Sequence, residues 1–174
     1  MSLAFEIRRL AAGDAADYRG IRLAALASAP EAFSSTYEIE ATRPPEAFAE
    51  RLEASVVYAA YHQDRIVGVA GIAPRLGPKG RHRGFLWGMF VRPDARRLGA
   101  ARLLLDALLI AASDRFEQVT LEVAAGNMAA LALYEQSGFV RYGTAPRALK
   151  SASGYQDEIL MVKFLDPGPS SRPR

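Results

Sequence analysis

The feature that most constrains the fold is a turn between an apolar strand-like segment and a long apolar helix-like segment. Residues 85–91 form the strand, Pro93 fixes the exit, and small residues at 99–101 open a helical pattern. Because the first N–H groups of a helix lack internal acceptors and lie at its positive end, such a turn binds anions. Three arginines add positive charge: Arg96, Arg97 and Arg102. The turn therefore predicts a pyrophosphate site, although an ordinary helix start with solvated arginines gives the same pattern.

Length and composition indicate one compact domain. The chain has 174 residues and half of them are apolar, which is enough for a continuous core. We expect this domain to span residues 1–165 and residues 166–174, rich in proline and serine, to form a frayed tail. No segment approaches the ~20 apolar residues of a membrane span, and no signal-length apolar run follows the N-terminus. We therefore expect a cytoplasmic protein without a membrane partner.

Charge and cysteine content narrow the chemistry. The formal net charge is +3, from 22 basic and 19 acidic residues, which argues against a nucleic-acid partner. A basic glycine-rich loop at residues 74–84 leaves a nucleic-acid-binding module as a distant alternative, since such loops are usually just solvated. The chain has no cysteine, which excludes disulfides and a cysteine nucleophile, and its two histidines lack the spacing of a helical zinc site. We expect no bound metal.

The remaining patterns predict a mixed sheet with helices packed on it, in the order βααβββαβαββ. Residues 31–42 are expected to be a polar and aromatic connection. The sheet is not a doubly wound dinucleotide fold, because no Gly-x-Gly-x-x-Gly follows the first strand. The expected strands and helices are a strand near Phe5, helices 14–28 and 44–52, strands 56–61, 66–72 and 85–91, helix 99–112, strand 118–123, helix 127–136, and strands 139–143 and 158–164.

A second motif, residues 127–139, makes the interpretation more specific. Asn127, Ala130 and Tyr134 are spaced so that they share one face of a helix, and Gly138-Phe139 follows it. Together with the Arg-x-x-Gly-x-Ala turn, this segment resembles the GNAT superfamily of N-acetyltransferases over about residues 85–142. The resemblance implies an α/β (α+β) fold: a mixed, mostly antiparallel sheet of about seven strands flanked by about four helices, with strands four and five splayed.

The resemblance also implies acetyl-CoA as cosubstrate and names the residues that would hold it. The backbone at the end of strand four, Met89, Phe90 and Val91, would pair with the pantetheine amides. Asn127 would bond near the pantetheine arm or cap its helix. The turn that would cradle the pyrophosphate comprises Arg96, Arg97, Leu98, Gly99, Ala100 and Ala101.

Tyr134 has two interpretations. In the family pattern it matches the tyrosine that faces the thioester sulfur and protonates the leaving thiolate. Its spacing from Gly138 and Phe139 is also that of a Schellman cap, in which the tyrosine ring packs on Phe139. Both can hold at once, because a ring can pack while its hydroxyl reaches a site. We expect the catalytic role.

The general base is less clearly encoded. Many relatives carry a glutamate on strand four, but residues 85–91 contain no titratable side chain. Glu122 on the fifth strand is the best substitute, with Glu40 and His82 behind it, and an ordered water is the alternative. Four aromatic residues are candidates for an acceptor pocket, although such residues are more often core: Phe33, Tyr37, Tyr61 and Trp87.

The expected function is direct transfer of an acetyl group from acetyl-CoA to a primary amine of a small molecule or a protein terminus. No acyl-enzyme is needed, which agrees with the missing cysteine and the missing Gly-x-Ser-x-Gly motif. The alternative is a GNAT-like module that binds CoA without turnover, because strand four lacks its carboxylate. The oligomeric state stays open, although members of the family often form homodimers.

Overall fold

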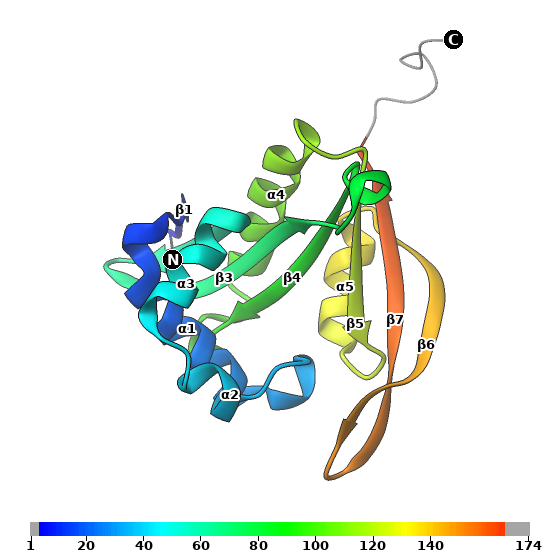
Figure 1. Ribbon diagram of the computed structural model, residues 1–174, viewed down its shortest axis with the longest axis horizontal. Helices are drawn as coiled ribbons and strands as arrows, with labels where there is room; N and C mark the ends of the chain where they lie inside the picture. Colours follow the sequence, from blue (N-terminus) through cyan, green and yellow to red (C-terminus); the bar gives the residue numbers. More distant parts are fainter. Residues whose placement is uncertain (1–3, 166–174) are drawn as a thin grey trace.

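A seven-stranded sheet in the order β1-β2-β3-β4-β5-β7-β6 organises the chain in the computed structural model, which describes residues 4–165 (Figure 1). Neighbouring strands are antiparallel except for β4 and β5, which are parallel. This arrangement confirms the predicted mixed, mostly antiparallel sheet. The strands are β1 (Glu6–Arg9), β2 (Val56–His62), β3 (Arg65–Pro74), β4 (Arg83–Val91), β5 (Gln118–Ala124), β6 (Val140–Ser151) and β7 (Gly154–Phe164). The tail predicted at residues 166–174 lies outside the described residues.

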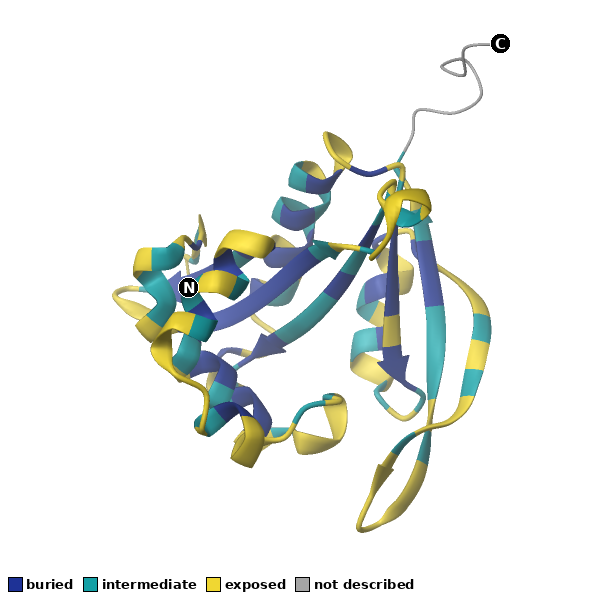
Figure 2. Ribbon diagram, in the orientation of Figure 1, coloured by how far each residue is buried: buried dark blue, intermediate teal, exposed yellow. Residues whose placement is uncertain are grey.

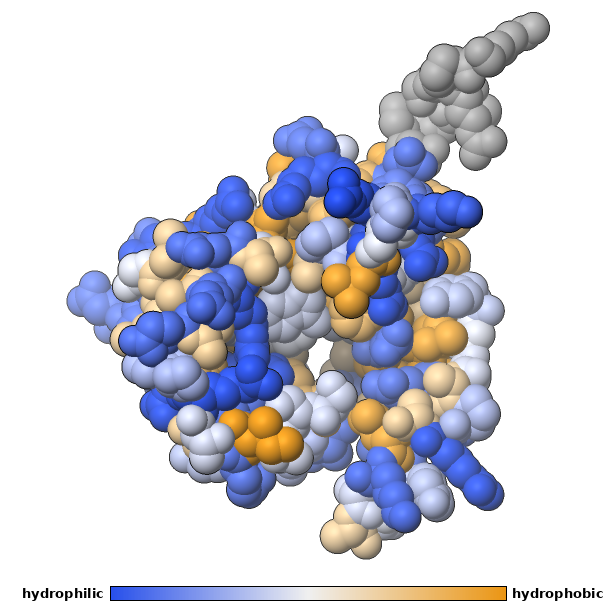
Figure 3. Space-filling model, in the orientation of Figure 1, coloured by the Kyte–Doolittle hydropathy of each residue, from blue (hydrophilic) through white to orange (hydrophobic). Residues whose placement is uncertain are grey.

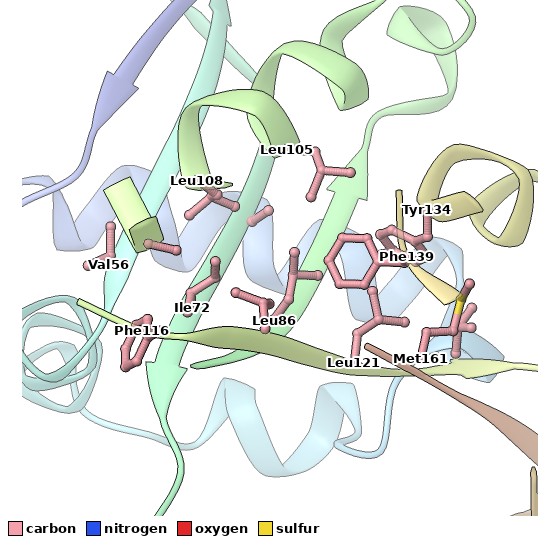
Figure 4. Close-up of a cluster of buried hydrophobic side chains, with 14 of the residues drawn as sticks. Val56, Ile72, Leu86, Leu105, Leu108, Phe116, Leu121, Tyr134, Phe139 and Met161 are labelled. Atoms are coloured by element: carbon pink, nitrogen blue, oxygen red, sulfur yellow. The ribbon is translucent and has the colours of Figure 1, made fainter. Parts of the chain in front are cut away.

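Helices cover both faces of this sheet. The four main helices of residues 4–165, as predicted, are α1 (Ala15–Ser28), α3 (Pro45–Ala54), α4 (Ala100–Ser113) and α5 (Met128–Gln136), and the short helix α2 (Tyr37–Ala41) precedes α3. Tyr18 of α1 and Phe48 of α3 pack with Val69 and Phe90 on one face of the sheet. On the other face, the apolar stripes of α4 and α5 form a second core with β3, β4, β5 and β7 (Figure 4). No helix of residues 4–165 is long and apolar enough to cross a membrane.

Two elements differ from the sequence prediction. Residues 31–42 contain the short helix α2, which begins where the Thr36 hydroxyl accepts a hydrogen bond from the Ile39 N–H at 3.4 Å. The last two strands extend well beyond the predicted ranges 139–143 and 158–164 and form a long hairpin. Most side chains in the outer part of this hairpin are exposed (Figure 2), so the sequence there lacks the apolar alternation that marks a half-buried strand.

Strand β4 pairs with β5 along only the first part of its length. Its first residues, Arg83 to Phe85, pair with β5, and the pairing then stops. On its other side, β4 pairs with β3 through a bulge, because Val69 faces Phe90 whereas Gly71 faces Trp87. The extra residue bends β4 away from β5. Residues 86–91 of β4 follow β3 through this bulge but do not pair with β5, and we call this stretch the β4–β5 split. The split confirms the predicted splay of strands four and five.

Candidate functional site

Gly88 lies in the bulge at the centre of the β4–β5 split. Its φ is +67°, a left-handed conformation that costs other L-residues energy. In the orientation of Figure 1, the space-filling view shows an opening through the molecule where the two strands diverge (Figure 3). Strand backbone that faces such a split keeps N–H and C=O groups free to bond an extended ligand. Met89, Phe90 and Val91, the residues predicted to bind pantetheine, all lie in this stretch.

The turn at the end of β4 has the geometry of an anion site. After Val91 and a 3₁₀ turn at Pro93–Ala95, two residues with positive φ follow, Arg97 at +59° and Gly99 at +94°. Alternation of this kind turns successive N–H groups toward one point. Among the described residues, no side chain caps the N-terminus of α4, so its first N–H groups remain available.

The side chains of this turn leave its concave backbone accessible. Residues 96–99 are exposed, whereas Ala100 is buried against Leu104 and Val91. Arg96 bends back, and its Nε donates to the Val91 carbonyl at 3.0 Å. Arg102 pairs with Asp106 on the outer surface of α4. In this conformation the backbone of the turn, more than its arginine side chains, offers the donors for a phosphate.

Asn127 is the N-cap of α5. Its Oδ1 accepts a hydrogen bond from the Ala130 N–H at 3.2 Å. Of the two roles predicted for Asn127, the structure therefore confirms the helix cap. The predicted contact with the pantetheine arm stays a prediction.

Tyr134 is the third residue from the end of α5 and forms the expected Schellman cap. The Phe139 N–H donates to the Tyr134 carbonyl at 3.0 Å, and the two rings meet edge to face with centroids 5.8 Å apart (Figure 4). Both rings belong to the core cluster against which Met89 of the β4–β5 split also packs. Burial raises the pKa of Tyr134 above its ordinary value of 10.0, so the phenol stays protonated at neutral pH.

Glu122 lies on the opposite face of the sheet. Its neighbours Leu121 and Val123 are in the core cluster with Tyr134, and strand alternation directs Glu122 away from it. Its carboxylate is half-exposed and pairs with Arg75 at 3.1 Å. Arg75 in turn lies over the ring of Phe85, 4.0 Å from its centroid. The structure thus holds this carboxylate on the face that carries α1 to α3.

Glu158 is a second carboxylate on that face, and the sequence pattern did not identify it. In the β5–β7 register, Leu160 faces Glu122 and Glu158 faces Ala124, so the two glutamates are diagonal neighbours. Burial, and then the charge of Glu122, raises the pKa of Glu158. Only the register between β5 and β7 brings them together, and no local motif encodes it.

The two other candidate bases fit the role poorly. Glu40 is buried and pairs with Arg22, Arg51 and Arg43 at 3.3, 3.2 and 3.8 Å. Burial would raise the pKa of Glu40, but the charges of Arg51 and Arg22 outweigh it and hold the pKa below its ordinary value. His82 lies just before β4, about 23 Å from Met89 along the strand at ~3.3 Å per residue.

The four aromatic candidates for an acceptor pocket do not lie together in the structure. Trp87 lines a cavity beside α1 and α3, and Phe33 stacks under Arg22 at 5.1 Å. Tyr61 is buried in the core cluster of α1 and α3, and its hydroxyl donates to Asp17. Tyr37 is exposed on α2.

Comparison with known proteins agrees with this geometry. The model of the acetyltransferase (GNAT) family matches residues 23–139, which include the β4–β5 split, the turn before α4 and α5. The chain therefore belongs to the GNAT family of acetyltransferases, whose members use acetyl-CoA. Membership confirms the family expected from the two motifs.

The individual relatives of this chain share only part of its sequence. The [ribosomal protein bS18]-alanine N-acetyltransferase of Salmonella typhimurium is 38% identical over 78 residues, which cover 44% of this chain and 53% of that protein. The chain thus matches only about half the length of this relative. A ribosomal-protein-alanine N-acetyltransferase from Brucella melitensis has a similar structure, with a TM-score of 0.77, 26% identity, and coverage of 92% and 99% of the two chains.

A third relative supports the fold alone. A putative acetyltransferase from Salmonella typhimurium, whose structure was determined with acetyl-CoA, matches with a TM-score of 0.84 at 19% identity. The match covers 97% of this chain and 98% of the other. The whole sheet and its helices therefore follow the family architecture, including the hairpin of β6 and β7.

Proposed function

We propose that this protein transfers the acetyl group of acetyl-CoA directly to a primary amine of a small molecule or a protein terminus. The observation that carries the proposal is the continuity of the β4–β5 split with the turn before α4. Free strand backbone along β4 suits the amides of pantetheine, and the N–H groups of the turn suit a pyrophosphate. An extended ligand that has both groups, as CoA does, can bind along the whole path.

In this proposal, the N–H groups of the turn from Arg96 to Ala101 hold the pyrophosphate. The backbone of Met89, Phe90 and Val91 pairs with the pantetheine amides, and an N–H near Met89 polarises the thioester carbonyl. Asn127 holds the start of α5 against the pantetheine arm. Bound acetyl-CoA supplies the activated acyl group, and the chain supplies orientation and proton transfer.

The two proposed catalytic groups approach the split from opposite faces of the sheet. Glu122, directly or through a water, removes a proton from the substrate ammonium, which frees the nitrogen lone pair. The nitrogen forms the new N–C bond as the C–S bond breaks, and the thiolate takes its proton from the Tyr134 hydroxyl. Because burial raises the pKa of Tyr134, its proton is present at the start of each turnover.

Arg75 and Glu158 surround the proposed base. The Arg75 ion pair orients the Glu122 carboxylate, and Glu158 lies diagonally across the β5–β7 pair. Burial and the charge of Glu122 raise the pKa of Glu158, which favours the protonated form of this second carboxylate and makes it the poorer base. We therefore expect Glu122→Gln to lower kcat more than the matched substitution Glu158→Gln.

The assay for this function measures thiol release from acetyl-CoA over a panel of primary amines. Because the Salmonella relative is an enzyme for the alanine of ribosomal protein bS18, the panel includes a peptide that begins with alanine beside free amino acids and simple amines. We expect turnover with at least one acceptor, and about a 10²-fold lower kcat in Glu122→Gln. Unchanged kcat in this variant would exclude Glu122 as the base.

A second candidate is a GNAT-shaped module that binds CoA without turnover. The observation that favours it is the absence of a titratable side chain from residues 85–91 of β4. Calorimetry separates the two functions. Tight CoA binding without acetyl transfer to any amine of the panel would support the binding module.

A further inference from the structure

A cavity of about 250 Å³ lies on the same face of the sheet as Glu122, between the helices and β4. Trp87 forms one wall, and it is the only tryptophan of the chain. The cavity opens widely to solvent, and its volume, below the ~300–1,000 Å³ of sites for drug-sized ligands, suits a small molecule or one short group of a larger one. The residues that line it are Arg22, Glu40, Arg51, Ser55, Ala73 and Trp87.

The charges at this cavity are unbalanced. Arg22, Arg43 and Arg51 all pair with the single carboxylate of Glu40. Arg51 also donates to the Tyr18 hydroxyl at 3.5 Å, a neutral partner. Arg22 and Arg51, whose side chains are 10% and 22% exposed, set two guanidinium groups against one buried carboxylate, whereas solvent screens the charge of Arg43, whose side chain is 45% exposed. The site therefore favours an additional anion.

Arg22 has the least complete set of partners. Only 8% of the residue is exposed, and its Nη2 bonds to Glu40 at 3.3 Å. Its Nε is buried and has no hydrogen-bond partner within residues 4–165. A buried donor without an acceptor costs free energy, and a charged one costs more. Of the five N–H donors of the Arg22 guanidinium, protein partners within residues 4–165 thus use only part, which leaves donors for a further acceptor oxygen.

The same arginine lies beside the β4–β5 split. A Cβ atom placed on Gly88 would be 3.8 Å from Arg22 Nη1, so the guanidinium lies against the bulge of β4. Trp87 precedes Gly88, and Met89 follows it with the N–H proposed to polarise the thioester. A molecule bound at Arg22 is therefore next to the position proposed for the acetyl group.

From this arrangement we infer that the cavity binds the carboxylate of a small acceptor that carries both a carboxylate and a primary amine, as a free amino acid does. The inference rests on the proposed acetyl transfer and specifies its acceptor. Arg22 and Arg51 hold the carboxylate, since the planar guanidinium matches two carboxylate oxygens. In a free amino acid only one carbon separates the amine from the carboxylate. A carboxylate held at Arg22 therefore keeps the amine close to the β4–β5 split.

Trp87 provides a binding measurement that needs no turnover. The intact protein, saturated with CoA, is titrated with L-alanine and with L-alaninamide, which keeps the amine but lacks the carboxylate, while tryptophan fluorescence is recorded. We expect L-alanine to bind at least about tenfold more tightly than L-alaninamide, and L-methionine, titrated in the same way, to bind more tightly than L-methioninamide, because the amide loses a charge-assisted bond. Equal affinities, or no response to either carboxylate, would overturn the inference.

Variants test the role of the arginine. Arg22→Gln should lower the affinity for the amino acid about tenfold or more and leave that for the amide nearly unchanged. Arg22→Lys keeps the charge and should retain an intermediate preference, so it serves where Arg22→Gln fails to fold by circular dichroism. Arg115→Gln, at an exposed arginine beside Phe116, is the control. A carboxylate preference as large as that of the wild type in Arg22→Gln, or in Arg22→Lys where Arg22→Gln does not fold, would contradict the assignment.

The outcomes separate this inference from the proposed function. Acetyl transfer to amides and amino acids with equal kcat/KM would reject the carboxylate site and retain the acetyltransferase. Carboxylate-dependent fluorescence without thiol release from any amine would reject catalysis and retain the site. Sodium sulfate in the same titration distinguishes a carboxylate site from a general anion site, and binding of sulfate as tight as that of L-alanine would contradict the inference.

Discussion

The carbonyl of Tyr134 accepts the N–H of Phe139 at 3.0 Å, while the edge of one ring meets the face of the other. The backbone and the ring of Tyr134 thus terminate α5 and pack the core, and neither contact uses the phenol hydroxyl. Packing and proton donation by Tyr134 are therefore separable by substitutions that change one and keep the other.

Tyr134→Phe removes the hydroxyl and keeps the ring. We expect the free energy of unfolding to change by about 1 kcal/mol or less, because no cavity is made. The kcat for acetyl transfer should fall about 10²-fold if the hydroxyl is the general acid. Phe139→Leu is the reverse case and should lower stability with a smaller effect on kcat. Urea unfolding and thiol release measure both, and a full loss of activity in Phe139→Leu alone would argue for a purely structural Tyr134.

Gly88→Ala tests the bulge that opens the β4–β5 split. Because φ is +67° at this position, alanine should cost about 1–2 kcal/mol of stability or force the bulge to rearrange. CoA binding should weaken together with stability, since the bulge sets the path of β4. Gly126→Ala is the matched control, because a Cβ there meets nothing within 4 Å. Calorimetric CoA affinity equal to wild type in Gly88→Ala would show that the bulge does not shape the site.

Leu98→Glu tests the turn as an anion site. Leu98 is exposed just before α4, where a negative charge interacts favourably with the helix dipole, so folding should be unharmed. The same charge should repel a bound pyrophosphate and weaken CoA binding about tenfold or more at low salt. Leu98→Gln controls for size, and Ile110→Glu, exposed near the other end of α4, controls for added charge. Equal loss in Leu98→Glu and Ile110→Glu would contradict the location of the site.

The Glu40 cluster predicts a pH dependence of stability. Since the pKa of Glu40 lies below its ordinary value of 4.5, its ionised form stabilises the fold above that pH, and this contribution is lost as pH falls through the folded pKa. At pH 7, Glu40→Gln should lower the free energy of unfolding by about 3–5 kcal/mol, the typical effect of breaking a buried ion pair. The difference from wild type should shrink below pH 4.5, as measured by urea unfolding. Glu38→Gln, on the exposed side of α2, controls for the substitution itself, and a difference independent of pH would contradict the prediction.

Local patterns in the sequence determine several features without any tertiary contact. Each of these features involves residues only a few positions apart: the turn from Arg96 to Ala101, the Asn127 cap and the contact of Tyr134 with Phe139. Their geometry follows from backbone hydrogen bonds within one turn, which short-range residue preferences encode. For the same reason, the predicted strands and helices that pack on the core agree with the structure, whereas the solvated hairpin of β6 and β7 was underestimated.

Tertiary structure alone decided which side chains meet at the site. The partners Arg51 and Arg22 are 11 and 18 positions from Glu40, and Arg75 is 47 positions from Glu122. The Glu122–Glu158 pair depends on β7 lying between β5 and β6, and the β4–β5 split depends on one extra residue in the pairing of β4 with β3. Such contacts arise from strand register and helix packing, to which the whole chain contributes, so no local motif contains them.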